Sequence, residues 1–334
     1  MQNPPWTPPE LLKISGSYWS ACTLHAGVKL GVFTSLSAGP LTATELAAQL
    51  ALDERGLAML LDALAALELL AKEQTVYRAT PFARQFLSAD SADYLGHILM
   101  HQHHLVDSWA RLDESVRTGA PSRRRVSHDA DEIERESFLL GMFNLAMHLA
   151  PQVVKQIDLS GRSRLLDLGG GPGTYAIHFC QQNPQLQATI FDLPTTREIA
   201  EATVGRFALQ ERIRFVAGDF QHDSLSGSYD VAWLSHVLHG EGEAGCRRML
   251  QKTADHLEPG GMLLVQEFIL DDSRDRPLFP ALFSLNMLLC TPHGKAYSEG
   301  EIRTLLEAAG FEQVARLALE LPNGAGVMCG LKPR

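Results

Sequence analysis

The chain has 334 residues, of which 45% are hydrophobic and 20% charged, so it can fill about two folded domains and is not a disordered chain. Its formal net charge of −10 argues against general binding to nucleic acid or anionic membranes, which need clustered lysine and arginine. The five cysteines are odd in number and lack C-x-x-C spacing, which argues against a disulfide framework and a structural zinc site.

The pattern of the N-terminal half predicts a succession of helices rich in alanine and leucine. Residues 1–13 contain no basic segment followed by an apolar one. No stretch of the sequence approaches the roughly 20 uninterrupted apolar residues that span a bilayer. We therefore expect a cytoplasmic protein that has no membrane partner.

A helix-turn-helix followed by a short extended segment is predicted within residues 40–81, which is the element order of a winged helix. Its second helix, at about 53–70, is acidic and has Arg55 as its only basic residue. Phosphate would repel such a helix, so DNA binding is disfavoured. The apolar helices at 15–30 and 57–70 are instead expected to bury each other and a second copy of the chain. This part is therefore a predicted dimerisation domain.

Three consecutive arginines, Arg123 to Arg125, follow a loop and precede an acidic helix. This pattern predicts a solvated loop beside a helix of opposite charge, with anion binding as the alternative. We assign residues 1–155 to the helical dimerisation domain with its linker helices, and residues 156–334 to a second domain.

Short apolar runs typical of strands alternate with helical stretches from Arg164 onward, which predicts a parallel sheet with helices on both faces. The last two runs, 313–321 and 325–331, are separated by Pro-Asn-Gly at 322–324. That turn predicts a hairpin with an antiparallel strand at the edge of the sheet. The expected fold is α/β, with a doubly wound, Rossmann-like, mostly parallel seven-stranded sheet.

A glycine-rich turn follows the first of these strands, in LLDLGGGPGT at 165–174, and leads into a predicted helix at 174–182. Glycines allow a tight turn and let a ligand approach the main chain closely. A nucleoside-triphosphate loop is excluded because no lysine follows the glycines. A dinucleotide such as NAD remains open, since Gly171, Gly173 and Ala176 have its spacing, and so does S-adenosylmethionine (SAM).

Two acidic residues follow the next two strands. Asp192 ends the second strand, where a carboxylate accepts the ribose hydroxyls in both NAD and SAM sites. Asp219 follows the third strand, where it can accept from an adenine amino group while Phe220 covers the ring. Ligands of open α/β sheets bind at this carboxyl edge of the strands. Capping of helices is the alternative role of the two acids.

The ordered series of motifs resembles that of the class I SAM-dependent O-methyltransferases, in particular the plant caffeate-type and bacterial antibiotic-type enzymes that act on small aromatic hydroxyl groups. The series comprises DLGGGPG, DLP at 192–194, GDF at 218–220, a strand ending in His239, LEPGG at 257–261 and Glu267. The resemblance spans nearly the whole chain, and members of this family carry an N-terminal winged-helix dimerisation domain.

The resemblance implies a role for each matching residue. The implied cofactor contacts are Gly169, Gly171, Gly173, Asp192, Leu193, Asp219, Phe220 and Ser235, the last at a position where the family often has lysine. His239 falls at the catalytic histidine and Glu267 at the glutamate that orients it. A positioned base that removes a phenolic proton is typically worth about 10²–10⁴ in rate. No metal is expected, although His236 stands close before His239.

Two positions depart from the family pattern. The segment after His239 lacks the family's tryptophan, and Ala296 replaces a second glutamate that usually flanks the histidine. With less negative charge to stabilise the imidazolium, we expect a modestly weaker base than in the plant enzymes.

Two helices are expected to form the wall of the acceptor site. Phe143, Asn144 and Met147 lie on the helix before the second domain, and Phe283 and Met287 lie on the helix after the fifth strand. Apolar residues at this spacing also occur on helices that pack into a hydrophobic core without contacting a ligand. Met147 and Met287 match family positions at which methionines sandwich a flat aromatic ring, a role that suits a soft thioether.

The expected function is therefore that of a homodimeric SAM-dependent O-methyltransferase acting on a small aromatic or polyketide-like molecule. Methylation of carbon or nitrogen on the same scaffold is an alternative, because the cofactor motifs do not encode which atom attacks. An NAD-dependent oxidoreductase and a non-catalytic SAM-binding regulator are further alternatives, since the fold alone does not fix function.

Overall fold

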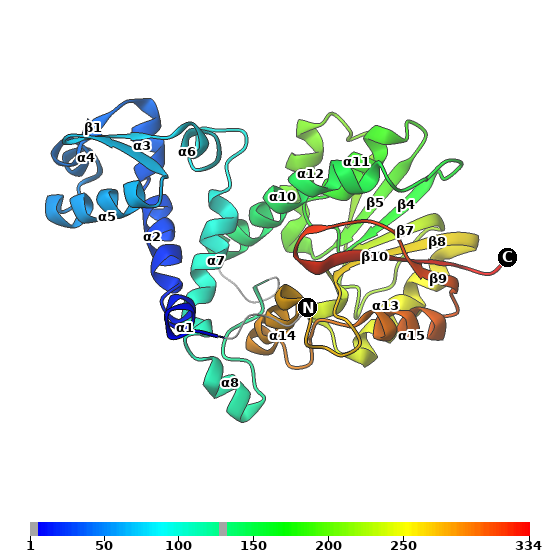
Figure 1. Cartoon of the computed structure of the whole chain (residues 1–334). Coiled ribbons are helices and arrows are strands. Elements are labelled where there is room, and N and C mark those ends of the chain that lie inside the picture. The colour runs from blue at the N-terminus through cyan, green and yellow to red at the C-terminus, as the bar shows by residue number, and fades with distance from the viewer. Residues whose placement is uncertain (1–5, 127–131) are drawn as a thin grey trace. The chain divides into compact units, whose positions relative to one another are not determined.

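The computed structural model describes residues 6–126 and 132–334 (Figure 1). The chain divides into two compact units, Met1–Leu105 and Val106–Arg334. This division falls earlier than the predicted boundary after residue 155. The helix that ends at Val154 packs into the core of the second unit, so the predicted linker helices belong with the second domain rather than the first.

The first unit is helical and contains a small antiparallel sheet. Thr42 forms a capping box with Glu45 at the start of α4, and Asp53 caps α5 by accepting from the Gly56 N–H. The strands pair in the order β1-β3-β2. The elements are α1 (Pro8–Ser15), α2 (Tyr18–Lys29), α3 (Val32–Ala38), β1 (Leu41–Thr42), α4 (Ala43–Leu50), α5 (Glu54–Ala66), β2 (Leu70–Glu73), β3 (Val76–Ala79), α6 (Pro81–Phe86) and α7 (Gly96–Trp109), the last of which crosses into the second unit.

Two helices of this unit differ from their predicted bounds. The predicted helix 15–30 is split after Ser15, and α2 covers most of it. The predicted helix 57–70 ends at Ala66, because Glu68 adopts a left-handed backbone with φ of 61°, and β2 follows. The two helices and the extended segment predicted for a winged helix are nevertheless present in the predicted order.

Large apolar side chains are exposed on α1, on α2 and just before α1. Trp6 and Trp19 are 69% and 68% exposed. The others in this group are Leu11, Leu12, Ile14 and Tyr18. The core of the unit lies elsewhere, around Phe33, Leu61 and Leu64, which are fully buried. An exposed apolar surface of this kind is typical of a site that binds another protein surface.

The second unit is built on a seven-stranded, mostly parallel sheet, which confirms the predicted fold class. Its strands are β4 (Arg164–Leu168), β5 (Gln187–Asp192), β6 (Ile213–Ala217), β7 (Tyr229–Ser235), β8 (Leu257–Phe268), β9 (Glu312–Arg316) and β10 (Ala325–Leu331). Their order is β6-β5-β4-β7-β8-β10-β9, and β4 to β8 are mutually parallel.

The predicted hairpin lies at the edge of the sheet, but its antiparallel strand is the inner member. β10 pairs antiparallel with both β8 and β9, so β9 forms the edge. Burial agrees with this order, because five of the seven residues of β10 are buried whereas β9 buries only its central Val314. β10 has its predicted bounds, and β9 is shorter than the predicted 313–321.

Helices cover both faces of the sheet (Figure 1). One core forms where α10, α11 and α12 pack on one face, and a second forms where α13 and α15 pack on the other. The helices of the unit are α8 (Leu112–Thr118), α10 (Glu132–Val154), α11 (Thr174–Gln182), α12 (Arg197–Arg206), α13 (Glu243–His256), α14 (Leu278–Cys290) and α15 (Glu299–Ala308).

The strand order places a crevice at the carboxyl ends of β4 and β7. From β4 the chain builds outward on one side through β5 and β6, and on the other side through β7 and β8. Such a reversal of strand order is the position at which open α/β sheets bind their ligands. The glycine turn after β4 and the segment after β7 therefore meet at the expected site.

Among the described residues, α10 is the one helix whose length and composition would suffice to cross a membrane. Its C-terminal part packs in the core of the second unit, where Ala150, Val153 and Val154 are buried. Core helices of globular domains have the same composition. The expectation that the protein has no membrane partner stays a prediction.

Candidate active site

The glycine turn after β4 contains three glycines in left-handed backbone conformations. Gly169, Gly171 and Gly173 have φ of 68°, 53° and 80°. A Cβ on Gly173 would lie 2.4 Å from the Cδ1 atom of Ile190, and one on Gly169 would lie 2.5 Å from Cγ1 of Val237. A side chain at either position would have to displace a neighbouring side chain and would strain the backbone. A Cβ on Gly171 would meet nothing within 4 Å, so the main chain there faces open space.

Asp192, at the end of β5, holds this turn. Its Oδ2 accepts from the Gly171 N–H at 2.7 Å, and its Oδ1 accepts from the Leu193 N–H at 2.6 Å and from the Thr196 hydroxyl at 3.1 Å. The carboxylate thus ties the ends of β4 and β5 together. The structure thus places this carboxylate beside the glycine turn, and it caps neither of the two helices that follow it, whose N-cap residues are Leu193 and Thr196.

Asp219 and Phe220 follow β6. The Oδ1 atom of Asp219 accepts from the Gln221 N–H at 2.7 Å, and its Oδ2 lies 2.8 Å from Nδ1 of His222. Phe220 packs partly buried against the core, and its ring reaches the glycine turn, since a Cβ on Gly169 would lie 3.8 Å from its Cε1. Asp219 therefore stabilises its own turn, while Phe220 lies beside Gly169 in the glycine turn.

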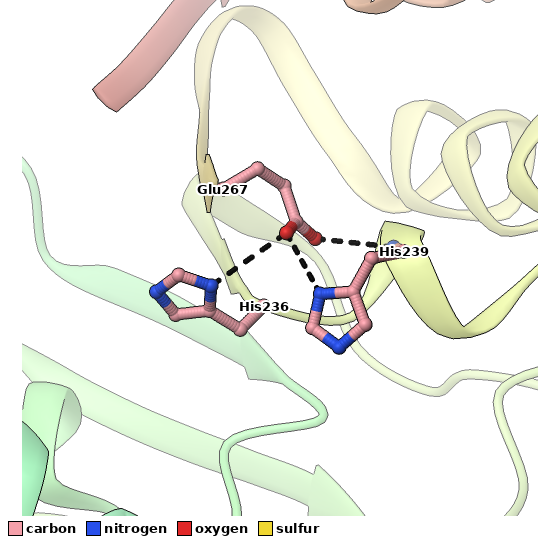
Figure 2. A group of neighbouring side chains, drawn as sticks. All are labelled: His236, His239 and Glu267. Atoms are coloured by element: carbon pink, nitrogen blue, oxygen red, sulfur yellow. Dashed lines mark hydrogen bonds and ion pairs between the residues drawn. The ribbon is translucent and has the colours of Figure 1, made fainter. Parts of the chain in front are cut away.

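The segment after β7 carries His239 against the buried carboxylate of Glu267, which lies near the end of β8 (Figure 2). Nδ1 of His239 lies 2.8 Å from Oε2 of Glu267. Oε1 accepts from the main-chain N–H of Leu238 at 2.8 Å and from that of His239 at 3.3 Å. Because an ionised carboxylate only accepts hydrogen bonds, Nδ1 carries a proton, and in the neutral form of the ring the lone pair is therefore on Nε2.

The charge state of Glu267 follows from its neighbours. Burial alone would raise the pKa of this carboxyl group, but the charge and the hydrogen bond of His239, together with the nearby imidazole of His236, hold its pKa well below the ordinary value. Glu267 is therefore ionised at neutral pH and can stabilise a positive charge on the His239 ring.

His236 is a second imidazole on the same carboxylate, and the sequence singled it out only as a weak metal candidate. Its Nδ1 lies 3.6 Å from Oε2 of Glu267 (Figure 2), and its ring packs at 4.3 Å between centroids on Phe268. The backbone of His236 is left-handed, with φ of 55°. The sequence predicts a strand ending in His239, but β7 ends at Ser235 and His239 lies in the turn Leu238–Gly240 that follows. A histidine three residues before His239 was the available signal for this arrangement.

The ligand atoms of His236, His239 and Glu267 lie within 4.8 Å of one another, which is the geometry of a possible metal centre. Two ligand atoms of a tetrahedral zinc ion are about 3.4 Å apart, however, since each lies about 2.1 Å from the metal. The 2.8 Å separation of His239 Nδ1 and Glu267 Oε2 is a hydrogen-bond distance. The geometry therefore favours a hydrogen-bonded pair, and the absence of a metal stays a prediction.

An aromatic wall borders His239 on the side of α14. The ring of Phe283 meets the His239 ring edge-on, with centroids 4.8 Å apart and an interplanar angle of 87°, and it also packs on Phe268 at 4.8 Å. Of the predicted acceptor-site residues, Phe283 is therefore in contact with the histidine. Met287 lies one turn further along α14 and is buried.

The other predicted wall residues lie on α10. Phe143, Asn144 and Met147 are all partly buried, and the Oδ1 atom of Asn144 is enclosed and has no hydrogen-bond partner among the described residues. A buried amide oxygen without a donor is unusual and suits a ligand that supplies one. Contact of these three residues with an acceptor stays a prediction.

The segment that contains Ala296 supports the backbone of His239. The Lys295 N–H donates to the His239 carbonyl at 2.9 Å, and the Ala296 N–H donates to the Ser284 hydroxyl at 3.1 Å. Ala296 is 1% exposed, so the position of the family's second glutamate is occupied by a small buried side chain. Glu267 is thus the carboxylate that the described structure places on His239.

The three consecutive arginines separate into different environments, and the predicted solvated loop is correct only for Arg124, which is exposed. Arg125 forms a half-buried ion pair with Glu241 at 2.8 Å, just after His239. Arg123 donates to the Oδ1 atom of Asn286 on α14 at 2.9 Å. These partners are distant in sequence, so the local charge pattern did not reveal them.

Comparison with known proteins decides the family. The model of the O-methyltransferase domain matches residues 110–312, and that of the O-methyltransferase dimerisation domain matches residues 12–89. The chain belongs to the O-methyltransferase family. This confirms the resemblance inferred from the motifs, and the dinucleotide and non-catalytic interpretations are set aside because the chain is an O-methyltransferase enzyme.

Individual relatives of this O-methyltransferase have different acceptors. It is 34% identical to 3-hydroxy-5-methyl-1-naphthoate 3-O-methyltransferase of Streptomyces sahachiroi, over 97% of this chain and 95% of that protein. It is 30% identical to the N,N-dimethyltransferase OxyT of Streptomyces rimosus, over 97% and 96% of the two chains. The structure of human N-acetylserotonin methyltransferase in complex with SAM superimposes with a TM-score of 0.85, at 27% identity and full coverage of both chains.

SAM is the cofactor of this O-methyltransferase, and the residues at the carboxyl edge of the sheet fit it. The main chain at Gly171 faces open space beside Asp192, and the ring of Phe220 lies near Gly169 in the same turn. Beneath the turn, Asp167 is buried, its Oδ2 has no hydrogen-bond partner among the described residues, and burial raises its pKa to about 7. A buried carboxyl group without a hydrogen-bond partner, next to the open space at the glycine turn, is compatible with the cationic methionine part of SAM.

Ser235 ends β7 at the position where the family often has lysine. Burial raises the pKa of Tyr175, and hydrogen bonds from Gln266 and Ser235 partly oppose that shift. The contact of Ser235 with SAM in this O-methyltransferase stays a prediction.

Proposed function

We propose that this O-methyltransferase transfers the methyl group of SAM to a hydroxyl group of a small aromatic or polyketide-like molecule, with His239 as general base and Glu267 as the residue that positions it. The observation that carries the proposal is the 2.8 Å contact between Nδ1 of His239 and the buried carboxylate of Glu267. It leaves Nε2 of His239 available beside the aromatic ring of Phe283.

The chemistry follows from these contacts. When bound, SAM supplies a methyl group already activated by the sulfonium, so the chain has to provide orientation and a proton acceptor. A phenol has a pKa near 10 and is mostly protonated at neutral pH. His239 takes this proton at Nε2, and the ionised Glu267 stabilises the resulting imidazolium through Nδ1. Such assistance typically contributes about 10²–10⁴ in rate.

We assign the cofactor contacts to the glycine turn and the strand ends around it. Gly171 would approach the methionine part of SAM, Asp192 and Leu193 would hold the ribose and flank the adenine, and Asp219 and Phe220 would hold the adenine. The open space at Gly171 and its place beside Asp192 support this assignment. Because Asp192 already accepts from the Gly171 N–H, cofactor binding would exchange that hydrogen bond for bonds to the ligand.

The acceptor would lie against Phe283 and Met287 on α14, with Phe143, Asn144 and Met147 on α10 as further wall residues. The contact of Phe283 with His239 supports the first part of this assignment. A flat aromatic acceptor suits such a wall, because aromatic rings favour edge-on and offset contacts with one another.

The first unit would act as a winged-helix domain that pairs two copies of the chain. The match to the dimerisation-domain model and the exposed Trp6 and Trp19 support a homodimer. The acidic helix α5 disfavours nucleic acid as a partner, and a cytoplasmic location agrees with the free cysteines of the described structure.

Methylation of nitrogen is the second candidate, and one relative favours it, since OxyT is named an N,N-dimethyltransferase. The need for a base separates the two reactions. A hydroxyl group requires proton removal during transfer, whereas a neutral amine is already nucleophilic.

The test measures transfer from labelled SAM to a panel of naphthols and the matching naphthylamines, with wild type and His239→Ala. We expect turnover of a naphthol to fall about 100-fold or more in the variant, while SAM affinity measured by calorimetry is kept. His256→Ala is the control, because that ring bonds the Lys252 carbonyl at the end of α13, away from Glu267. Preferred transfer to an amine, with little effect of His239→Ala, would contradict the proposal.

A further inference from the structure

Arg123 is a largely buried guanidinium without a carboxylate partner among the described residues. Its Nη2 donates to the side-chain Oδ1 of Asn286 at 2.9 Å, and its Nε is enclosed and has no hydrogen-bond partner there. The neighbouring Arg125 differs, since it forms an ion pair with Glu241 at 2.8 Å. Arg124 is exposed and needs no partner. Of the three arginines, Arg123 is thus the one whose charge is enclosed and not neutralised.

The surroundings of Arg123 contain little to compensate this charge. Burial lowers the pKa of Arg123, and the nearby thiol of Cys290 and carboxyl group of Glu134 oppose that shift. A guanidinium remains charged in proteins, so it cannot escape burial by losing its proton. A buried charge without a counterion is unfavourable, and a ligand that supplies the anion relieves it.

The position of Arg123 relates it to the catalytic pair through α14. Phe283 touches the His239 ring, Asn286 follows one helical turn later, and Arg123 binds Asn286. Three residues of an α-helix advance by about 4.5 Å, roughly the width of an aromatic ring. An aromatic acceptor whose hydroxyl group meets Nε2 of His239 would therefore bring a substituent on its far side toward Arg123.

We propose that Arg123 binds a carboxylate on the acceptor, so that the substrates of this enzyme are hydroxyaryl carboxylic acids. The inference rests on the proposed function of the same site. The Nη atoms of a guanidinium form a planar fork that matches the two oxygens of a carboxylate, which gives both attraction and orientation. The carboxylate would hold the ring so that only the hydroxyl group opposite it reaches His239.

The experiment compares hydroxynaphthoic acids with the corresponding hydroxynaphthamides and naphthols, using wild type, Arg123→Gln and the matched control Arg124→Gln. For wild type we expect at least one acid to have a KM at least 10-fold below that of its amide. Arg123→Gln should raise the KM of that acid at least 10-fold and change the KM of the naphthol less than threefold. Arg124→Gln should leave both values unchanged, because its side chain is exposed.

Two further measurements keep the outcome decisive. Arg123→Lys preserves the charge without the fork, so its KM for the acid should lie between those of wild type and Arg123→Gln even if the glutamine variant is unstable. Calorimetric binding of a naphthoate and a naphthamide to the enzyme with S-adenosylhomocysteine tests recognition without turnover. Failure of every hydroxyl compound to be methylated would reject the proposed function but would leave this binding comparison intact.

Equal affinity of wild type for acid and amide would overturn the proposal. An Arg123→Gln variant whose KM rises equally for naphthol and hydroxynaphthoate would also overturn it, because Arg123 would then only support α14 through Asn286.

Discussion

The carboxylate of Glu267 contacts both the ring and the main-chain N–H of His239. One carboxylate oxygen lies 2.8 Å from Nδ1, and the other accepts from the His239 N–H at 3.3 Å. The ring is therefore fixed both in orientation and in tautomer, since Nδ1 carries the proton. A group that fixes a base in this way should act with it as a unit, and energetic coupling between the two residues can be measured.

The first prediction concerns that coupling. Glu267→Gln keeps the shape of the side chain but removes its charge, so we expect turnover to fall about 10–100-fold. His239→Ala should lower turnover about 100-fold or more in wild type. In the Glu267→Gln background it should have a much smaller effect, because the base is already impaired. Independent, multiplicative losses in the double variant would show that Glu267 does not act through His239.

Gly171 and Gly173 should respond differently to alanine. Gly173→Ala drives a methyl group into Ile190 in the core, so we expect a loss of about 2–4 kcal/mol in the free energy of unfolding from overpacking and backbone strain. At Gly171 the new methyl group enters open space, which leaves about 1–2 kcal/mol of strain but obstructs the cofactor.

Denaturant unfolding and SAM titration check this pair. For Gly171→Ala we expect SAM affinity at least 10-fold lower with a chain that remains folded. If Gly171→Ala bound SAM as wild type does, the open space above that turn would not be the cofactor site.

Asp167 predicts a dependence of stability on pH. Burial raises its pKa from 3.8 to about 7. Between these values the folded chain keeps the proton and the unfolded chain releases it. The contribution of the neutral acid to the free energy of unfolding is therefore complete below pH 3.8 and is lost as pH rises to about 7. Asp167→Asn removes this loss. The free energy of unfolding of the variant should therefore exceed that of wild type by an amount that grows between pH 4 and 7 and stays constant above.

The size of this advantage is on the order of 4 kcal/mol when fully developed, since each pKa unit corresponds to about 1.4 kcal/mol. Urea unfolding of SAM-free protein at several pH values between 4 and 8.5 measures it. An advantage that did not change with pH would mean that Asp167 ionises normally in the folded chain.

Exposed tryptophan on α2 predicts the oligomeric state. Trp19→Glu places a charge in the surface that we assign to the homodimer, so this variant should sediment as a monomer at micromolar concentration where wild type is dimeric. Leu278→Glu is the matched control, because Leu278 is a similarly exposed apolar residue of the second unit. Dissociation by both variants, or by neither, would place the interface elsewhere.

Local sequence signals predicted the elements that position the cofactor. The helix at 174–182 and the strand at 325–331 have their predicted bounds, because a glycine turn and a Pro-Asn-Gly turn delimit them. The pairing of His239 with Glu267 also agrees with its implied geometry. In each case the informative residues are adjacent in sequence or lie at successive strand ends.

Local sequence signals did not predict the contacts between residues that are distant in sequence. Arg123 and Arg125 meet partners 163 and 116 residues away, and nothing in the run of three arginines distinguishes their environments. The place of β10 inside the sheet depended on how completely its two faces are covered, which composition alone did not reveal. The Glu68 backbone at the end of α5 is likewise in a left-handed conformation that residues other than glycine seldom adopt.

His236 combines a strained backbone with a place in the site. Its left-handed conformation is one that glycine or asparagine adopts more easily, yet its ring packs on Phe268 and faces Glu267. In directed evolution of this chain, selection for stability and selection for activity would therefore favour different residues at position 236. A screen for heat resistance would favour exchanges that relax the turn, and a screen for catalytic speed would discard them, so variants should be ranked by both criteria before any are combined.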